Sequence, residues 1–303
     1  MNTIESIKAG LGNLFRAKPP SILYKYCSPE RIDVLKNGCL RFSQPPVFND
    51  PFESSPAFLN LADRKTMERA SKIEGARTGM PEEYRQHMLD GLFSESGDQA
   101  RKAVAGLLLE ILGRGVGVLS LTAKPDNLLM WAHYAKSHEG FVIGFKTNDP
   151  FLSRPGARRD AANDLRRVIY SAQRPKPQFL ANVGLIEMYF TKSKNWEYEE
   201  EWRMFTSLPE EDSRDAIIAS VANIAQFGSP GSSQPYPVRL FDFPAACVER
   251  IIVGCRATDE TQNTISEIAA AKYPHAKLLK AVISPTDFKL ELKELSAVPS
   301  GQQ

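Results

Sequence analysis

An acidic and aromatic stretch at residues 196–203, Trp-Glu-Tyr-Glu-Glu-Glu-Trp-Arg, brings together side chains that could do chemistry. On a strand, Glu199, Glu201 and Arg203 would share one face because successive side chains alternate, and Glu200 would point the other way. On a helix, Glu199 and Arg203 lie four residues apart and again meet. Either geometry places carboxylates beside a guanidinium and next to aromatic surface, which suits a site. A structural Glu–Arg pair on an edge strand is the alternative interpretation.

A loop at residues 44–53, Gln-Pro-Pro-Val-Phe-Asn-Asp-Pro-Phe-Glu, is the second candidate. Its prolines exclude regular structure, and its two phenylalanines predict that it packs on the body of the protein. Asn49 and Asp50 could cap a rigid turn by bonding nearby backbone groups. Asp50 and Glu53 could also line a cleft, and both interpretations can hold together.

The third candidate is the segment around Trp131, for which we expect a helix that opens at Pro125-Asp126 and ends at residues 138–140. On such a helix Trp131, Tyr134 and His138 share a face, and His133 is offset from it. The two histidines do not have the four-residue spacing that places two metal ligands on one helical face. The segment is therefore either an amphipathic core helix or a pocket wall.

The elements that position these clusters mix strands and helices without regular βαβ alternation, which predicts an α+β fold with a mixed, mostly antiparallel sheet. Strands are expected at residues 22–26, 40–43, 116–121, 141–145, 168–170, 203–206, 238–241, 251–254, 278–283 and 288–292. Helices are expected near residues 28–37, 81–93, 98–112, 125–138, 178–192 and 259–271, and a short helix is expected to start at residues 243–244. Residues 21–295 are predicted to form one domain with a helical insertion at 61–113. An amphipathic helix at 1–20 is predicted to precede this domain, and a disordered tail at 296–303 to follow it.

Composition sets few limits on function. The 303 residues include 38 basic and 36 acidic side chains, and this balance gives no global attraction to nucleic acid or membrane. No segment approaches the roughly 18 apolar residues of a membrane span. Four cysteines are too sparse for a disulfide scaffold, so we expect reduced thiols and a cytoplasmic protein. The N-terminal helix could dock on the body, or bind a partner protein or a membrane surface.

Together the clusters resemble a bacterial family known as domain of unknown function 2971. The matching features are Tyr-Lys-Tyr at 24–26, Phe-Ser at 42–43, Phe-Asn-Asp-Pro-Phe-Glu at 48–53, Met-Trp-x-His-Tyr-Ala-x-x-His-x-Gly-Phe at 130–141, Lys194 with Trp-x-Tyr-Glu-x-Glu-Trp-Arg at 196–203, and Ile-Ile-Val-Gly at 251–254. The resemblance spans about residues 22–292. It implies a place among toxin and phage-defence proteins.

A weaker resemblance connects this layout to ADP-ribosyltransferase-like folds. It implies an enzyme that uses NAD, a small-molecule nucleotide, and acts on a protein or nucleic-acid target. Tyr24 or Tyr26 would hold the NAD ribose and Ser43 would pack against the nicotinamide. A late glutamate would stabilise the positive charge that develops on the sugar, in surroundings that exclude water. The expected catalytic residues are Glu199, Glu201 and Arg203, and the expected NAD-binding residues are Tyr24, Tyr26, Arg41, Ser43, Asn49, Asp50, Glu53, Trp131, Tyr134 and His138.

Two other functions fit the same residues. A nuclease-type enzyme could hold a divalent metal with Asp50, Glu53 and Glu201, using His133 or His138 as a base. In a non-catalytic binding or sensor module, the three clusters would be purely structural.

Overall fold

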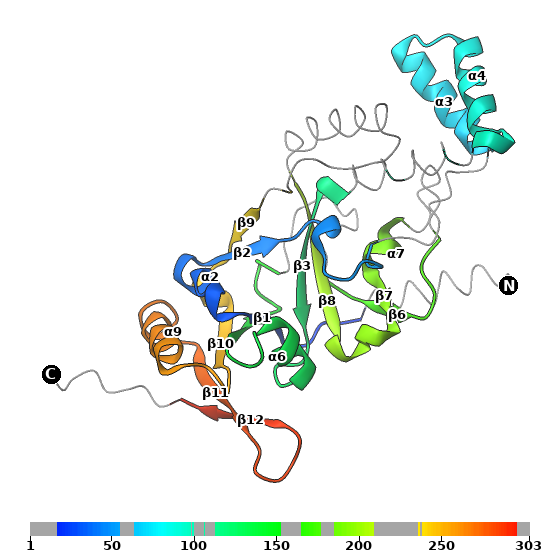
Figure 1. Cartoon of the computed structure of the whole chain (residues 1–303). Coiled ribbons are helices and arrows are strands. Elements are labelled where there is room, and N and C mark those ends of the chain that lie inside the picture. Colours follow the sequence, from blue (N-terminus) through cyan, green and yellow to red (C-terminus); the bar gives the residue numbers. More distant parts are fainter. Residues whose placement is uncertain are drawn as a thin grey trace.

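The main sheet of the protein confirms the α+β prediction (Figure 1). The computed structural model describes residues 17–54, 64–97, 99, 106, 113–152, 165–176, 185–208, 236 and 238–295. Within these residues the main sheet has eight strands, in the order β12 (Leu290–Glu294), β11 (Lys277–Ile283), β10 (Val248–Val253), β4 (Phe141–Lys146), β1 (Ile22–Cys27), β3 (Val116–Thr122), β8 (Glu201–Ser207) and β5 (Arg166–Arg167). Only the pair β10–β11 is parallel, so this sheet is mixed and mostly antiparallel as predicted.

Shorter elements surround this sheet. Two ribbons pair β2 (Cys39–Phe42) with β9 (Arg239–Asp242) and β6 (Ile169–Ser171) with β7 (Thr191–Ser193). The described α-helices are α2 (Asp33–Asn37), α3 (Arg64–Thr78), α4 (Glu82–Phe93), α6 (Leu128–Tyr134), α7 (Leu185–Phe190) and α9 (Asp259–Lys272). The described 3-10 turns are η1 (Pro29–Arg31), η2 (Pro45–Val47), η3 (Glu95–Gly97), η4 (Lys194–Glu199) and η5 (Ala245–Cys247).

Helices cover both faces of the sheet. Leu35 of α2 and Ile265 of α9 are fully buried in the core cluster on one face. On the opposite face, α6 buries Trp131 and α7 buries Phe190 against other strand residues. This division follows the alternation of side chains along the strands. Trp202 of β8 points into the first core, whereas Arg203 points to the second face.

The pairing of β3 leaves an opening in the sheet. β1 pairs with β4 over six residues, but its register with β3 is Tyr24↔Thr122 alone. Further along the same edge of β3, Ser43 is the pairing partner in place of β1. Ser43 and Val118 exchange two backbone hydrogen bonds of 2.9 Å. Between these contacts the carbonyl of Ser120 accepts a hydrogen bond of 3.0 Å from the Lys25 amine instead of from a strand. The sheet therefore separates at Ser120.

The helix expected at residues 125–138 is shorter than predicted. It starts after Asn127, whose side chain accepts hydrogen bonds from the N–H groups of Leu129 and Met130, and it ends at Tyr134. Residues 136–138 follow with positive φ angles and do not continue the helix. Backbone bonds from Gly254 and Arg256 to the 138–140 segment hold this turn against the end of β10. His138 therefore does not share a helical face with Tyr134.

Two further boundaries differ from the sequence prediction. A helix is expected at residues 178–192, of which the structure describes residues 185–192. In this part α7 ends at Phe190, and Thr191–Ser193 forms the strand β7. The stretch at 196–203 is not one strand, because η4 runs to Glu199, Glu200 is left-handed, and β8 begins at Glu201. Trp196 and Tyr198 thus do not share a strand face with Trp202. The loop at 44–53 includes the turn η2.

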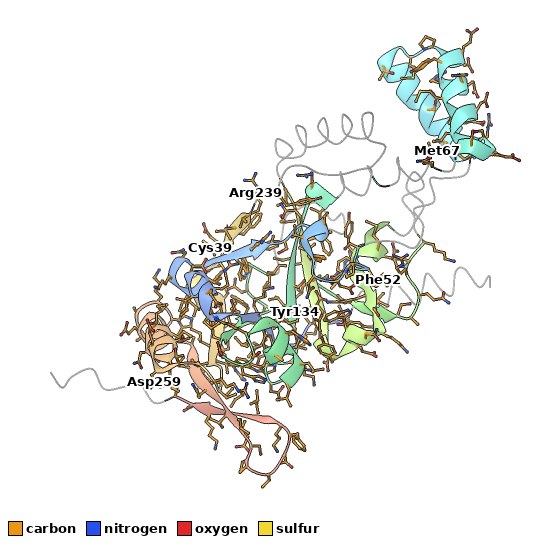
Figure 2. The ribbon with its side chains drawn as sticks, in the orientation of Figure 1. Cys39, Phe52, Met67, Tyr134, Arg239 and Asp259 are labelled. Atoms are coloured by element: carbon orange, nitrogen blue, oxygen red, sulfur yellow. The ribbon has the colours of Figure 1, made fainter. Side chains whose placement is uncertain are left out.

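The described part of the predicted insertion at 61–113 is mainly the helical pair α3–α4. In Figure 1 this pair projects away from the sheet, and in Figure 2 its Met67 lies well apart from Tyr134. The insertion stays a prediction, because the expected helix at 98–112, like the terminal segments 1–16 and 296–303, falls almost wholly outside the described residues. Among the residues that are described, no helix is long and apolar enough to cross a membrane.

Candidate functional site

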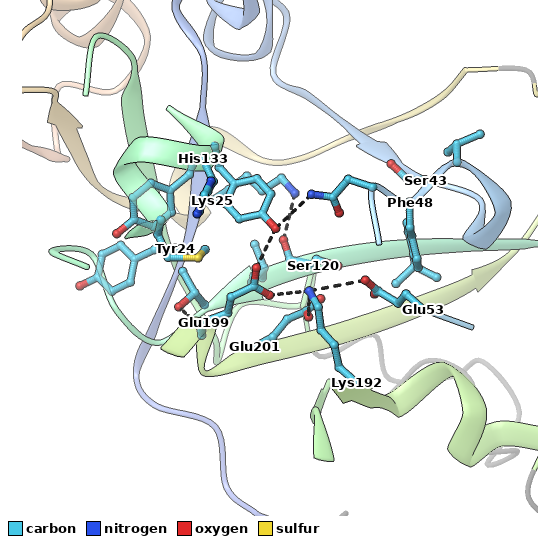
Figure 3. Close-up of a pocket in the computed structure, with 18 residues that line it drawn as sticks. Tyr24, Lys25, Ser43, Phe48, Glu53, Ser120, His133, Lys192, Glu199 and Glu201 are labelled. Atoms are coloured by element: carbon cyan, nitrogen blue, oxygen red, sulfur yellow. Dashed lines mark hydrogen bonds and ion pairs between the residues drawn. The ribbon is translucent and has the colours of Figure 1, made fainter. Parts of the chain in front are cut away.

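A pocket lies over the opening between β1 and β3 (Figure 3). Its volume of about 390 Å³ falls within the range of small-molecule sites. Its walls come from segments far apart in the sequence. They include Tyr24, Lys25 and Tyr26 of β1, Ser43, Phe48, Asn49 and Glu53 of the following loop, Ser120 and Thr122 of β3, His133 and Tyr134 of α6, Lys192 of β7, Glu199 of η4 and Glu201 of β8.

Arg203 is fully buried behind the pocket and organises its acidic side. Its Nε and Nη2 donate hydrogen bonds of 2.7 and 2.9 Å to the two carboxylate oxygens of Glu201. Its Nη1 donates to the carbonyl of Tyr189 at 2.5 Å, and Nη2 also reaches Glu53. Because a buried ion is costly unless it is well paired, this arrangement fixes both glutamates in place.

Lys192 joins the three carboxylates of the pocket. Its amine lies 2.5 Å from Glu199, 3.3 Å from Glu201 and 3.5 Å from Glu53 (Figure 3). All four side chains are almost completely buried. Two cations, Arg203 and Lys192, thus contact three carboxylates. Lys25, a partly buried residue, supplies a third amine or guanidinium group at the pocket.

Glu199 is presented to the pocket by the turn η4. The hydroxyl of Tyr134 donates a hydrogen bond of 2.7 Å to one Glu199 oxygen, while Lys192 holds the other. The backbone carbonyl of Glu199 accepts a hydrogen bond from the hydroxyl of Thr122. Asn127 donates to the carbonyl of Tyr198 at 2.9 Å. These contacts hold the turn on β3 and on the start of α6.

The electrostatics distinguish the acids. Burial raises the pKa of Glu199 and that of Glu53 above the usual glutamate range. Burial acts in the same direction on Glu201, but Arg203 and Lys192 outweigh it and hold the pKa of Glu201 well below that range. For Lys192, burial is outweighed by the three carboxylates, which raise its pKa. Glu199 contacts one cation, Lys192, whereas Glu53 contacts both Lys192 and Arg203. Of the three acids at the pocket, Glu199 is therefore the one best able to exchange a proton.

Lys25 is a pocket residue that the sequence prediction missed. Burial lowers the pKa of its amine, although Glu201 and Glu199 act in the opposite direction. The sequence shows the lysine between two tyrosines, and strand alternation directs it away from them. The Lys25 amine reaches the pocket because β1 and β3 separate, and no sequence pattern predicts that separation.

The structure brings eight of the residues predicted for the NAD-using enzyme to the pocket: Tyr24, Tyr26, Ser43, Asn49, Glu53, Tyr134, Glu199 and Glu201. His133, predicted as a base of the nuclease-type enzyme, lines it as well. Arg203 acts behind it through Glu201 and Glu53. Four others, Arg41, Asp50, Trp131 and His138, do not line it. Residues that line it without having been chosen include Phe48, Ser120 and Thr122.

The four absent residues have structural environments of their own. Trp131 is fully buried, and its indole N–H donates to the carbonyl of Pro125 at 3.0 Å. His138 lies in the turn after α6 and stacks on Trp131 with ring centroids 6.1 Å apart. Asp50 accepts a hydrogen bond of 2.9 Å from the N–H of Phe52, as the rigid-turn interpretation predicted. Arg41 lies on β2 opposite Leu240 of β9.

The residues proposed for a metal site are already engaged in other contacts. Glu53 and Glu201 are both bound to Arg203, and Asp50 caps its own turn. Within the described ranges, no three side chains of His, Cys, Asp or Glu are grouped so that they could hold a metal ion. The nuclease-type function stays an untested prediction.

Fold and site together define an α+β protein whose main sheet opens over a pocket with a buried Glu–Lys–Arg cluster. A family model described as Protein of unknown function (DUF2971) matches residues 130–204, which confirms the resemblance to that family in this segment. The segment runs from α6 to β8 and contains Tyr134, Lys192, Glu199 and Arg203. Neither the curated proteins nor the solved structures gave a match.

Proposed function

We propose that the protein is an ADP-ribosyltransferase-like enzyme that uses NAD as its substrate, and that it acts as a bacterial toxin or phage-defence effector. The observation that carries the proposal is the convergence of three sequence positions on one pocket. Tyr24 with Tyr26, then Ser43, then Glu199 with Glu201 all line it, although they come from distant parts of the chain. These are the positions that the resemblance assigns to the ribose, the nicotinamide and the catalytic acid.

In the proposed reaction the bond between the ribose C1′ and the nicotinamide nitrogen breaks. Its electron pair leaves with nicotinamide, which becomes neutral. The lone pair of a target group, or of water, forms the new bond to C1′, and the proton of that acceptor passes to Glu199. The sugar carbon carries positive charge between these events, so a carboxylate fixed beside it lowers the barrier.

Glu199 is better suited to this role than Glu201. Glu201 is held by both nitrogens of the Arg203 fork and by Lys192, so its negative charge is already neutralised. Glu199 contacts one cation and the Tyr134 hydroxyl, and burial raises its pKa, which favours uptake of a proton. We therefore assign the reacting carboxylate to Glu199 and a positioning role to Glu201 and Arg203.

The lining of the pocket also suits the reacting half of the substrate in its chemistry. Tyr24 and Phe48 offer ring surface for the nicotinamide and ribose. Lys25 supplies a cation that the carboxylates do not contact directly, and it can attract a phosphate of the nucleotide.

The test is the release of nicotinamide from NAD by the full chain, with and without bacterial cell extract. NAD labelled in its adenylate phosphate reports transfer to a macromolecular target in the same reaction. We expect Glu199→Gln to slow the release about 10²–10⁴-fold, the usual contribution of a catalytic proton-transfer group. Glu200→Gln should leave the rate unchanged, because Glu200 points outward and pairs with the exposed Lys124 at 3.4 Å. Failure of the native chain to consume NAD in extract would refute the proposal.

A further inference from the structure

A second hollow lies beside the pocket, between the loop at residues 49–52 and the turn η4. We call it the aromatic groove, and Asn49, Phe52, Trp196 and Tyr198 line it. Its volume is about 330 Å³. Phe52 is 62% exposed there, and Trp196 and Tyr198 are half-buried. Large aromatic side chains that line a groove and stay partly open to solvent are suited to hold a flat ring.

The aromatic groove adjoins the pocket. Asn49 lines both hollows. His133, a wall residue of the pocket, lies 6.4 Å from the ring of Trp196 and 6.4 Å from the ring of Tyr198, which both line the groove. A ligand seated over Glu199 can therefore extend past Asn49 and His133 into the groove.

Cations lie close to the aromatic rings of the groove. The Lys192 amine is 4.9 Å from the ring centroid of Trp196, and the Arg174 guanidinium is 5.5 Å from that of Phe52. A ligand in the groove could reach the exposed guanidinium of Arg174, whereas Lys192 is buried and paired with three carboxylates. This pattern suits a phosphate-linked ligand with a flat ring at its end.

We propose that the aromatic groove binds a nucleobase, the adenine ring of the same nucleotide whose reacting sugar lies in the pocket. The inference rests on the proposed function for the identity of that nucleotide. Phe52 and Trp196 supply the stacking surface, and stacking on aromatic side chains is a main source of affinity for a base. Stacking tolerates different bases, so adenine is selected by being part of the substrate.

The tryptophans of the chain provide a direct readout. The chain contains three, Trp131, Trp196 and Trp202. Trp131 is 0% exposed and Trp202 is 4% exposed, so Trp196 is the one that a ligand in the groove can reach. Intrinsic fluorescence is titrated with NAD, with AMP, which carries the adenine half, and with nicotinamide mononucleotide, which carries the other half. We expect NAD and AMP to change the Trp196 emission and the mononucleotide to leave it unchanged.

Substitutions then test the energetics by calorimetry. Trp196→Ala is expected to raise the Kd for AMP about 10–100-fold, which corresponds to the stacking energy of one base. Glu197→Ala is the matched control on the same turn, because its side chain is exposed and lines neither hollow. Phe52→Ala, on an exposed side chain, should also weaken AMP binding and decides the matter if Trp196→Ala fails to fold. An equal response to all three ligands, no response to any, or unchanged Kd values would overturn the inference.

The two proposals fail in different ways. AMP binding that depends on Trp196, in a chain that never consumes NAD, would refute the proposed function and leave the groove assignment standing. NAD consumption with a Kd for AMP that neither Trp196→Ala nor Phe52→Ala changes would refute the groove assignment alone. Glu199→Gln is expected to slow nicotinamide release and to keep AMP binding.

Discussion

At the scale of single residues, Arg203 determines the geometry of the acidic side of the pocket. It is fully buried and binds Glu201 through two nitrogens, Glu53 through one of the same nitrogens, and the Tyr189 carbonyl through a third. A buried guanidinium of this kind gives little net stability over an apolar residue, but its removal leaves two carboxylates without their main partner. Arg203 therefore contributes more to the positions of Glu201 and Glu53 than to the net stability of the protein.

The first prediction concerns the loss of that guanidinium. Arg203→Ala is expected to lower the free energy of unfolding by about 3–5 kcal/mol, because Glu201 and Glu53 stay buried and lose a cation. Urea unfolding followed by circular dichroism measures the change. Arg31→Ala is the control, since Arg31 pairs with Asp33 at 3.2 Å on the exposed surface and such pairs contribute at most about 1 kcal/mol. Similar losses in both variants would show that Arg203 does not hold the cluster.

The second prediction compares the two lysines of the pocket. Burial lowers the pKa of Lys25, whereas three carboxylates raise that of Lys192 against the effect of burial. Since only the neutral amine reacts with an acylating reagent, Lys25 should become reactive at a lower pH than Lys192. The two lysines are acetylated in short pulses across a pH series, and mass spectrometry measures the acetylation of the peptide that carries each. The pH midpoint of acetylation is compared for the two lysines, and it does not depend on the difference between their absolute reaction rates. The reverse order of midpoints would contradict the electrostatic account.

At the scale of elements, the turn after α6 is packed against the end of β1. The Gly140 N–H bonds the Ala135 carbonyl at 2.9 Å, and a Cβ on Gly140 would lie 2.1 Å from the carbonyl oxygen of Cys27. The neighbouring atom is backbone and cannot rotate away. The turn and the strand must therefore stay in close contact for β1 to keep its place beside the pocket.

The third prediction follows from that contact. Gly140→Ala is expected to destabilise the protein by about 1–3 kcal/mol, the usual cost of overpacking. Thermal unfolding measures the effect. The control is Gly91→Ala in α4, where an added Cβ meets nothing within 4 Å and alanine should be neutral or stabilise by up to about 1 kcal/mol. If the Gly140 variant unfolds at the native temperature, the close approach is not rigid.

The sequence predicted some elements closely and misplaced the ends of others. The helices α4 and α9 lie within one residue of the expected ranges 81–93 and 259–271, whereas β10 begins three residues before the expected strand at 251–254. β1, β3 and β4 lie within one residue of the expected ranges, because their apolar runs are bounded by clear turn residues. α6 was extended too far, because Asn127 starts it and the turn at 136–138 depends on tertiary contacts with Gly254 and Arg256. Those contacts join residues more than a hundred positions apart, and local patterns do not report them.

The site was predicted in part, and partly for the wrong reason. Strand alternation selected Glu199 with Glu201 and Arg203, and the three do lie together. Only Glu201 and Arg203 lie on β8, however. Glu199 is the last residue of η4, and it is separated from β8 by the left-handed Glu200. Lys25 was missed because its position depends on the gap between β1 and β3. Composition and spacing identify acids and aromatics, and strand pairing decides which of them meet.

At the scale of the whole molecule, the sheet and the projecting helices differ in burial. β4 lies inside the sheet between β10 and β1, and Phe141 and Ile143 are fully buried. In α4, Leu89 is the buried residue, whereas Tyr84 is 57% exposed and Met88 is 54% exposed. Stability against local opening grows with buried apolar contact, so the two regions should open independently.

Hydrogen exchange tests this difference. Amides of β4 are expected to exchange by global unfolding, at a free energy close to that of the whole domain, since they are hydrogen-bonded on both sides and sealed by two core layers. Amides of α4 are expected to exchange many times faster through local opening, because few apolar contacts oppose it. Mass spectrometry of peptides from both regions, with and without low urea, separates local from global opening. Urea should speed exchange in β4 and barely change it in α4. Equal protection in the two regions would show that the helical pair is an integral part of the sheet's cooperative unit, and the predicted insertion at 61–113 would then have to be abandoned.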